Sequence, residues 1–95
     1  MAVWLVPALA LAGDVAGDRP ACVRASASSV MTAFGYDHVV RIENTCAHPV
    51  RCLSHTSSAP SPVESILERD SSTELSLFRG SPASEFSATV ECTRR

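Results

Sequence analysis

The chain has 95 residues and a formal net charge of −2, with ten acidic side chains against eight basic ones. A chain of this length forms one domain. It has no lysine, which excludes Schiff-base chemistry, a P-loop and a Ser-Lys mechanism. Apart from the closing pair Arg94-Arg95, most arginines are scattered singly. Nucleic-acid-binding proteins present a clustered basic face, so no nucleic-acid partner is expected, and no cofactor is implied.

The first twelve residues, MAVWLVPALALA, carry no charged side chain. This run is shorter than the roughly 20 residues needed to span a bilayer. It suits the apolar region of a secretory signal peptide, and Ala10-Leu11-Ala12 has the small-x-small form of a cleavage site. We therefore predict a signal peptide over residues 1–12 and a secreted or periplasmic protein with no membrane span after cleavage. A buried first strand and a truncated membrane anchor are the alternatives.

The chain after the signal peptide divides into a lead-in and one domain. Residues 13–21, GDVAGDRPA before the first cysteine, combine Gly, Asp and Pro without apolar periodicity. We interpret them as a mobile lead-in, followed by a single β domain over residues 22–95. The stretch from residue 22 to residue 35 is ambiguous, and its serine cluster favours a strand followed by a long loop.

Alternating apolar and polar residues predict β-strands from Tyr36 onward. Five strands are readable, at residues 36–43, 50–56, 63–67, 73–78 and 85–92, and Cys22-Val23-Arg24 would begin a sixth. The faces expected to point inward carry Tyr36, His38, Val40 and Ile42; Val50, Cys52 and Ser54; Thr73, Leu75 and Leu77; and Phe86, Ala88, Val90 and Cys92. Turns rich in Pro, Gly and Ser separate the strands. The sequence therefore predicts an all-β fold, a small antiparallel β-sandwich or barrel of five to six strands.

Four cysteines in a small exported chain indicate disulfides, because exported domains meet oxidising conditions and have small cores. We expect the strand from Tyr36 to form a hairpin with the next strand, turning near residues 47–49. Cys46 and Cys52 would then be diagonal neighbours, too far apart to bond. The preferred pairs are Cys52 with Cys92, bridging two strands across the core, and Cys22 with Cys46. The alternative, Cys22–Cys52 with Cys46–Cys92, stays open.

A metal site is the second interpretation of the same segment. Cys46, His48, Cys52 and His55 supply two thiols and two imidazoles, enough for a tetrahedral zinc ion. Their spacing, however, matches no recurring zinc pattern. On the strand alternation, Cys52 and His55 also point to opposite faces. We therefore expect disulfides and no bound metal, and keep a Cys/His metal-binding protein as the alternative.

The other candidate residues give weaker signals. His38 lies on an apolar strand face, which predicts a buried, hydrogen-bonded imidazole. Ser54 and His55 raise the remote alternative of a small hydrolase, but the sequence has no GxSxG elbow, so we expect no enzymatic activity. Phe78 is expected to face outward beside Arg79 at a turn, which makes this pair a possible binding patch.

The segments YDHVVRIENTCAHPVRC and FRGSPASEF, with a final strand ending in Cys92, resemble short exported cysteine-containing proteins of myxobacterial type. The resemblance covers residues 36–92 and implies export, a β-rich fold and paired cysteines. No activity is assigned to those proteins, so it implies no catalytic residues. We expect a structural or binding module, held by two disulfides, that recognises an unknown protein or cell-envelope component through strand edges or the Phe78-Arg79 loop.

Overall fold

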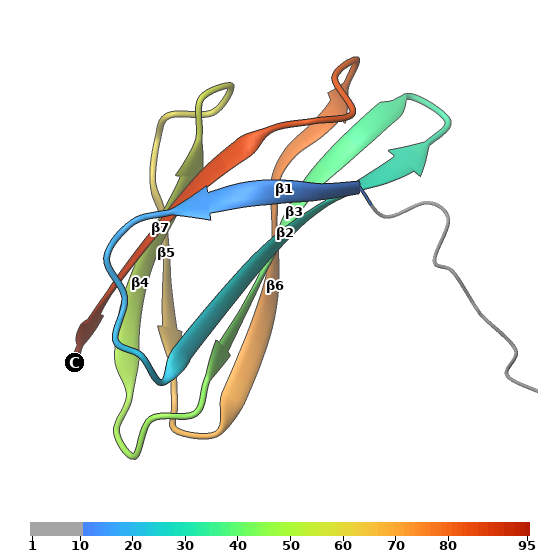
Figure 1. Ribbon diagram of the computed structural model, residues 1–95. Coiled ribbons are helices and arrows are strands. Elements are labelled where there is room, and N and C mark those ends of the chain that lie inside the picture. The colour runs from blue at the N-terminus through green and yellow to red at the C-terminus, as the bar shows by residue number, and fades with distance from the viewer. Residues whose placement is uncertain (1–10) are drawn as a thin grey trace, which may run out of the picture.

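The computed structural model describes residues 11–95, the first four of them by backbone alone. It is an all-β sandwich of seven strands, which confirms the predicted fold class (Figure 1). The strands are β1 (Leu11–Ala16), β2 (Val23–Thr32), β3 (Gly35–Asn44), β4 (Val50–Thr56), β5 (Val63–Leu67), β6 (Ser71–Ser81) and β7 (Ser87–Arg94). Within residues 11–95 there is no helix with the length and hydropathy that crossing a membrane requires.

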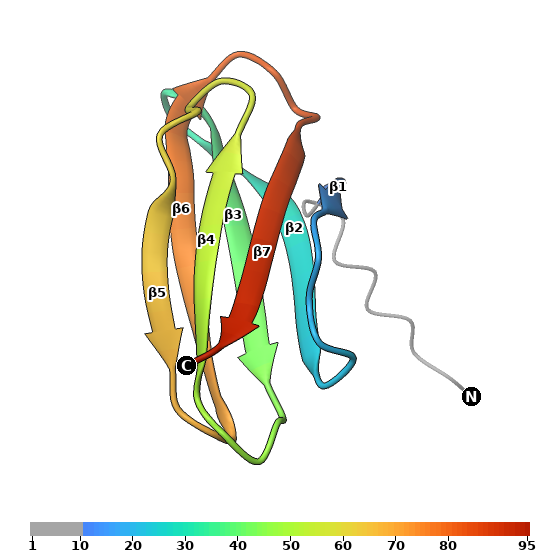
Figure 2. The ribbon, with the colours of Figure 1, turned by 90° about the vertical axis from the view of Figure 1, so that its left-hand side faces the viewer.

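The two sheets lie face to face, with β6, β3 and β2 in one and β5, β4 and β7 in the other (Figure 2). β1 closes one side of the sandwich by pairing with both sheets. Residues 11–13 run antiparallel to β2, and residues 14–16 run parallel to β7. The strand order is therefore β5-β4-β7-β1-β2-β3-β6, with β5 and β6 as the outer strands.

The predicted inward faces of three strands supply the centre of the core. The fully buried apolar side chains are Val40 and Ile42 of β3, Val50 and Cys52 of β4, and Val90 of β7. Along each strand the buried side chains occupy every second position, so one face of the strand enters the core and the other meets water. Removal of these side chains from water is the main favourable contribution to folding.

β1 occupies part of the segment that we expected to be a mobile lead-in. Its sequence LAGDVA contains Gly and Asp and does not alternate, so the strand depends on pairing with β2 and β7 rather than on its own side-chain pattern. The predicted signal peptide extends into it, since Leu11 and Ala12 pair with Ser29 and Ser28. The rest of that prediction, residues 1–10, lies outside the described residues.

The hairpin expected between β3 and β4 is not formed. β3 pairs with β2 and β6, whereas β4 pairs with β5 and β7 in the other sheet. Residues 45–49 therefore carry the chain from one sheet to the other. Alternation predicts which face of a strand is buried but not which strand lies beside it, because both arrangements bury the same residues.

Asn44, the only asparagine of the chain, holds the connection between the two sheets in place by hydrogen bonds. Its buried side chain donates from Nδ2 to the carbonyl oxygens of His48 (3.0 Å), Leu67 (3.1 Å) and Glu68 (3.1 Å). Its Oδ1 accepts a hydrogen bond from the Cys46 amide at 2.9 Å. One side chain thus satisfies backbone groups of two connections that would otherwise be buried without partners.

Candidate functional site

Two disulfides cross-link the sandwich, the frame that would hold any functional site. Cys22 bonds to Cys46, with 5.0 Å between their Cα atoms, and Cys52 bonds to Cys92, with 4.1 Å. Both preferred pairs are confirmed. Such bonds indicate an oxidising, extracytoplasmic environment.

The expected position of one bridge is wrong. Cys52 and Cys92 are direct partners on the adjacent strands β4 and β7, so this disulfide lies within one sheet and does not cross the core. The Cys92 amide donates to the Asp18 carbonyl at 3.0 Å, on the side away from β4. The two cysteines thus occupy a pair without hydrogen bonds between them, where neighbouring strands bring their side chains closest.

The alternative metal site is not formed. Cys46 and Cys52 belong to different disulfides, so neither offers a thiolate. The half-buried rings of His48 and His55 lie on the connection after β3 and on the outer face of β4. Across residues 11–95, no group of three or more His, Cys, Asp or Glu side chains could hold a metal ion.

The structure also keeps Ser54 and His55 apart. Ser54 is buried on the inner face of β4, and His55, the next residue, faces outward. Successive side chains of a strand point to opposite faces. The Ser–His arrangement behind the hydrolase alternative is therefore absent at these two residues.

His38 is the buried imidazole that the sequence predicts, with 1% of its surface exposed. Its Nε2 lies 2.9 Å from the Ala83 carbonyl, so Nε2 carries a proton and donates it. Its ring stacks on Phe86 at 4.1 Å and lies 6.0 Å from Phe78. His38 Nδ1 and the hydroxyl of Ser29, its neighbour across the β2–β3 pair, have no hydrogen-bond partner among the described residues. These contacts make His38 a packing residue between the sheets.

Phe78 does not face outward as the alternation predicted. β6 inserts an additional residue between Ser76, which pairs with Val39, and Phe78, which pairs with His38. A bulge of this kind changes the face to which the following side chains point. Phe78 is consequently half-buried on the face of His38, while Arg79 remains exposed. The Phe78-Arg79 patch stays a prediction, with less of the aromatic ring available than expected.

The most exposed apolar surface lies nearby, at the tip of the β2–β3 hairpin. Phe34 is 89% exposed, Met31 57% and Val30 46%. The sequence predicted a strand followed by a long loop over residues 22–35. The run VMTAFG places large apolar residues before a Gly, but the hairpin is seen only in the structure, where β2 and β3 pair from Thr32–Gly35 to Val23–Asn44.

Hydrogen bonds hold this tip in one shape. The Thr32 hydroxyl donates to the Gly35 carbonyl at 2.8 Å and accepts from the Phe34 amide at 3.2 Å. The Gly80 amide of β6 donates to Asp37 Oδ1 at 3.1 Å, which links β6 to β3 beside the tip. The apolar tip and Arg79 therefore lie at the same end of one sheet.

No known protein family, curated protein or solved structure matches this chain.

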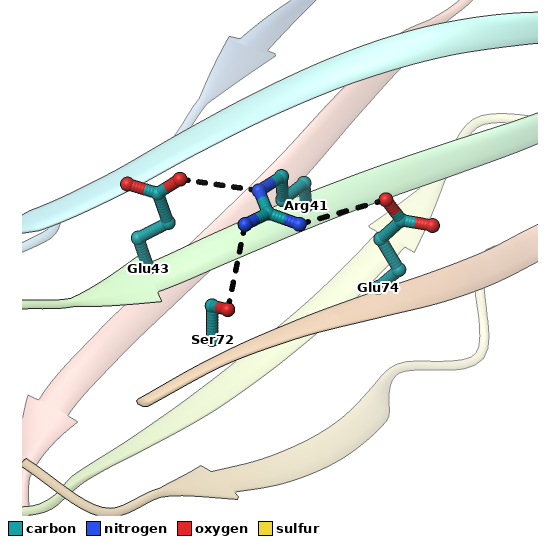
Figure 3. A network of polar contacts seen from close by, with 4 residues as sticks. All are labelled: Arg41, Glu43, Ser72 and Glu74. Atoms are coloured by element: carbon teal, nitrogen blue, oxygen red, sulfur yellow. Dashed lines mark hydrogen bonds and ion pairs between the residues drawn. The ribbon is translucent and has the colours of Figure 1, made fainter. Parts of the chain in front are cut away.

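The β2-β3-β6 sheet, which carries the hairpin tip, has on its outer face a polar network centred on Arg41 (Figure 3). Arg41 contacts Glu43 at 3.1 Å, Glu74 at 3.6 Å and the Ser72 hydroxyl at 3.5 Å. The charged side chains are roughly half exposed, and ion pairs in water contribute at most about 1 kcal/mol each. This face is solvated, in contrast to the apolar hairpin tip.

Proposed function

We propose that this small disulfide-bonded β-sandwich is an extracytoplasmic, non-catalytic binding module that recognises a protein partner through the end of the sandwich formed by Val30, Met31, Phe34 and Arg79. The observation that carries the proposal is the exposure of Phe34 at the tip of a hairpin fixed by hydrogen bonds. Met31 and Phe34, with Val30 on the opposite face of the same strand, place exposed apolar area at this end, and exposed apolar area marks interaction surfaces in soluble domains.

The rigidity of the tip supports a binding role. Gly35, with φ of +123°, brings the hairpin so close to β6 that an added Cβ would lie 2.6 Å from the Ser81 carbonyl oxygen. A surface that is already ordered loses little conformational entropy on association. Aromatic and arginine side chains are also the residues that most often dominate binding energy at protein interfaces. Phe34 is therefore the expected anchor, and Arg79 the expected polar contact beside it.

Export agrees with the same role. Two disulfides stabilise the frame, and the uncharged run over residues 1–12 suits a signal peptide. Secretion or release into the periplasm would place the domain among proteins and cell-envelope components rather than cytoplasmic substrates. The intact mass of the protein recovered from the organism that makes it tests this part, because it reports the cleavage site and the oxidation state together.

Site-specific photocrosslinking tests the binding surface. A photoreactive phenylalanine replaces Phe34 in one variant and Ala47, an exposed residue at the opposite end of β3, in the control. We expect a light-dependent covalent adduct with the partner protein from position 34 but not from position 47. Excess wild-type protein should suppress the adduct, whereas excess Phe34→Ser protein should not. Equal adducts at both positions, or suppression by both competitors, would contradict the proposal.

A further inference from the structure

A second surface lies at the other end of β2, about 30 Å from the hairpin tip at roughly 3.3 Å per strand residue. Here a hollow of about 430 Å³ opens beside the link from β1 to β2. It is lined by Arg19 of the link, residues 23–26 of β2, and Arg41 and Glu43 of β3. The hollow shares no residue with the proposed binding tip.

The charge of the hollow is opposite to that of the chain. Three arginines and one glutamate line it, a local balance of +2, whereas the whole chain carries −2. A concave surface with an excess of one sign of charge attracts ions of the other sign. An anion is therefore favoured at this place and not over the protein as a whole.

The three arginines differ in how they are engaged. Arg41 is paired with Glu43 and Glu74 (Figure 3). Arg24 lies across the strand pair from Glu43, and within the 11–95 segment its guanidinium makes no hydrogen bond or ion pair. Because Glu43 already neutralises Arg41, Arg24 is the cation with the most charge to offer a ligand.

Arg19 is fixed in place without losing its charge. Its Nη1 donates to the carbonyl oxygens of Ala16 and Val90, both at 3.1 Å, and of Gly17 at 3.4 Å. All three acceptors are neutral, and the bonds leave from one nitrogen, so the donors on Nε and Nη2 remain for a ligand. A guanidinium held in this way keeps its positive charge and its direction.

The floor of the hollow is ordered as well. The Cys22–Cys46 disulfide fixes the start of β2, and the Thr45 amide donates to the Cys22 carbonyl at 2.9 Å. Arg24 and the Ser26 hydroxyl follow directly on this strand, both on its exposed outer face. Planar guanidinium groups bind carboxylate and phosphate oxygens in pairs of parallel hydrogen bonds.

We propose that this hollow binds an oxyanion group, a carboxylate or a phosphate, through Arg24, with Arg19 and the Ser26 hydroxyl as further donors. The ligand that carries the group is anionic and reaches the outer face of the sheet from solvent.

Titration by NMR tests the proposal, with the arginine Nε–H signals as probes. Inorganic phosphate and acetate are added separately at constant ionic strength, with chloride as the reference anion. We expect saturable shifts at Arg24 and Arg19 for at least one of the two anions, and the response to each anion identifies the preferred group. Shifts that are linear, or identical with chloride, would overturn the proposal.

Matched variants locate the site. Arg24→Gln should weaken the binding of the responding anion at least fivefold. The affinity of Arg24→Lys for that anion should lie between those of Arg24→Gln and the wild type. Arg69→Gln removes an exposed arginine outside the hollow and should leave binding unchanged. Equal thermal midpoints of all variants in chloride confirm that folding is retained. Equal weakening by Arg24→Gln and Arg69→Gln would show general charge attraction and refute a defined site.

Discussion

The rings of His38 and Phe86 stack with their centroids 4.1 Å apart and their planes within 9° of parallel. His38 belongs to β3, and Phe86 stands one residue before β7, so the contact joins the two sheets. Phe78 approaches His38 from β6 at 6.0 Å. These three rings close the core at the end that carries the hairpin tip, which ties the stability of the frame to the surface proposed for binding.

The first prediction compares two phenylalanines. Phe86→Ala should lower the free energy of unfolding by about 2–3 kcal/mol, because it removes the stack on His38 and apolar area packed against the core. Phe34→Ala should change it by no more than about 0.5 kcal/mol, because that side chain is almost fully exposed. Urea denaturation without reductant measures both. Similar losses for the two variants would contradict the placement of these rings.

The second prediction concerns Asn44. Asn44→Ala leaves three carbonyl oxygens and one amide without their partner, and should cost about 2–4 kcal/mol. Asn44→Asp preserves the shape but replaces the donating amide with an acceptor among three carbonyl oxygens, so at neutral pH it should cost at least as much. Denaturant midpoints of the two variants check the order. An Asp variant as stable as the wild type would show that the amide donor is dispensable.

The third prediction compares Gly35 and Gly80, which lie on either side of the contact between the hairpin tip and β6. Gly35→Ala places a Cβ 2.6 Å from the Ser81 carbonyl oxygen at a φ of +123°, and should destabilise the protein by more than about 2 kcal/mol. Gly80→Ala, at a φ of +70° with its nearest atom 3.4 Å away, should cost only about 1 kcal/mol. Hydrogen exchange at residues 32–36 should accelerate in the Gly35 variant. The opposite order of the two losses would refute this contact.

The fourth prediction separates the disulfides. The double variant Cys22→Ala with Cys46→Ala opens a loop with a sequence separation of 24, and Cys52→Ala with Cys92→Ala one of 40. Chain-entropy arguments give a loss on the order of 3–4 kcal/mol for each. The second variant should lose more, because its loop is longer and because both Cys52 and Cys92 belong to the buried core, whereas Cys22 of the first pair is only partly buried. Thermal unfolding checks the order, and a thiol assay on the denatured wild type should find no free thiol.

The inward faces of β3, β4 and β7 were predictable because each pattern is set by burial within its own strand. The pair Cys52–Cys92 followed from these faces. Cys22–Cys46 was the pair that remained once Cys46–Cys52 had been disfavoured, and that step used a hairpin between β3 and β4 that is not formed. A pattern along one strand states which side is buried, and the neighbouring strand is chosen by packing of the whole sandwich. The pairing was therefore correct while the path of the chain between Asn44 and Val50 was not.

Three features were not predictable from local patterns. β1 has no alternation and exists through its two partners. Phe78 does not point outward as expected, because a bulge in β6 changes its face, and this bulge depends on the register of β6 with β3. The hairpin tip exposes Phe34, a residue type that is more often buried. For β1 and Phe78 the deciding contact is with another strand, so the residue's own neighbours in sequence do not reveal it.

The position of β7 has a consequence for the order of folding during synthesis. This strand lies between β4 and β1, so β1 is joined to the β5-β4 pair only once β7 has been made. A nascent chain lacking β7 leaves β1 and β4 without their common neighbour, and Cys52 without the thiol it bonds. Closure of the sandwich and formation of the second disulfide therefore wait for residues 87–94, so the tertiary structure forms late relative to the synthesis of β1 to β6.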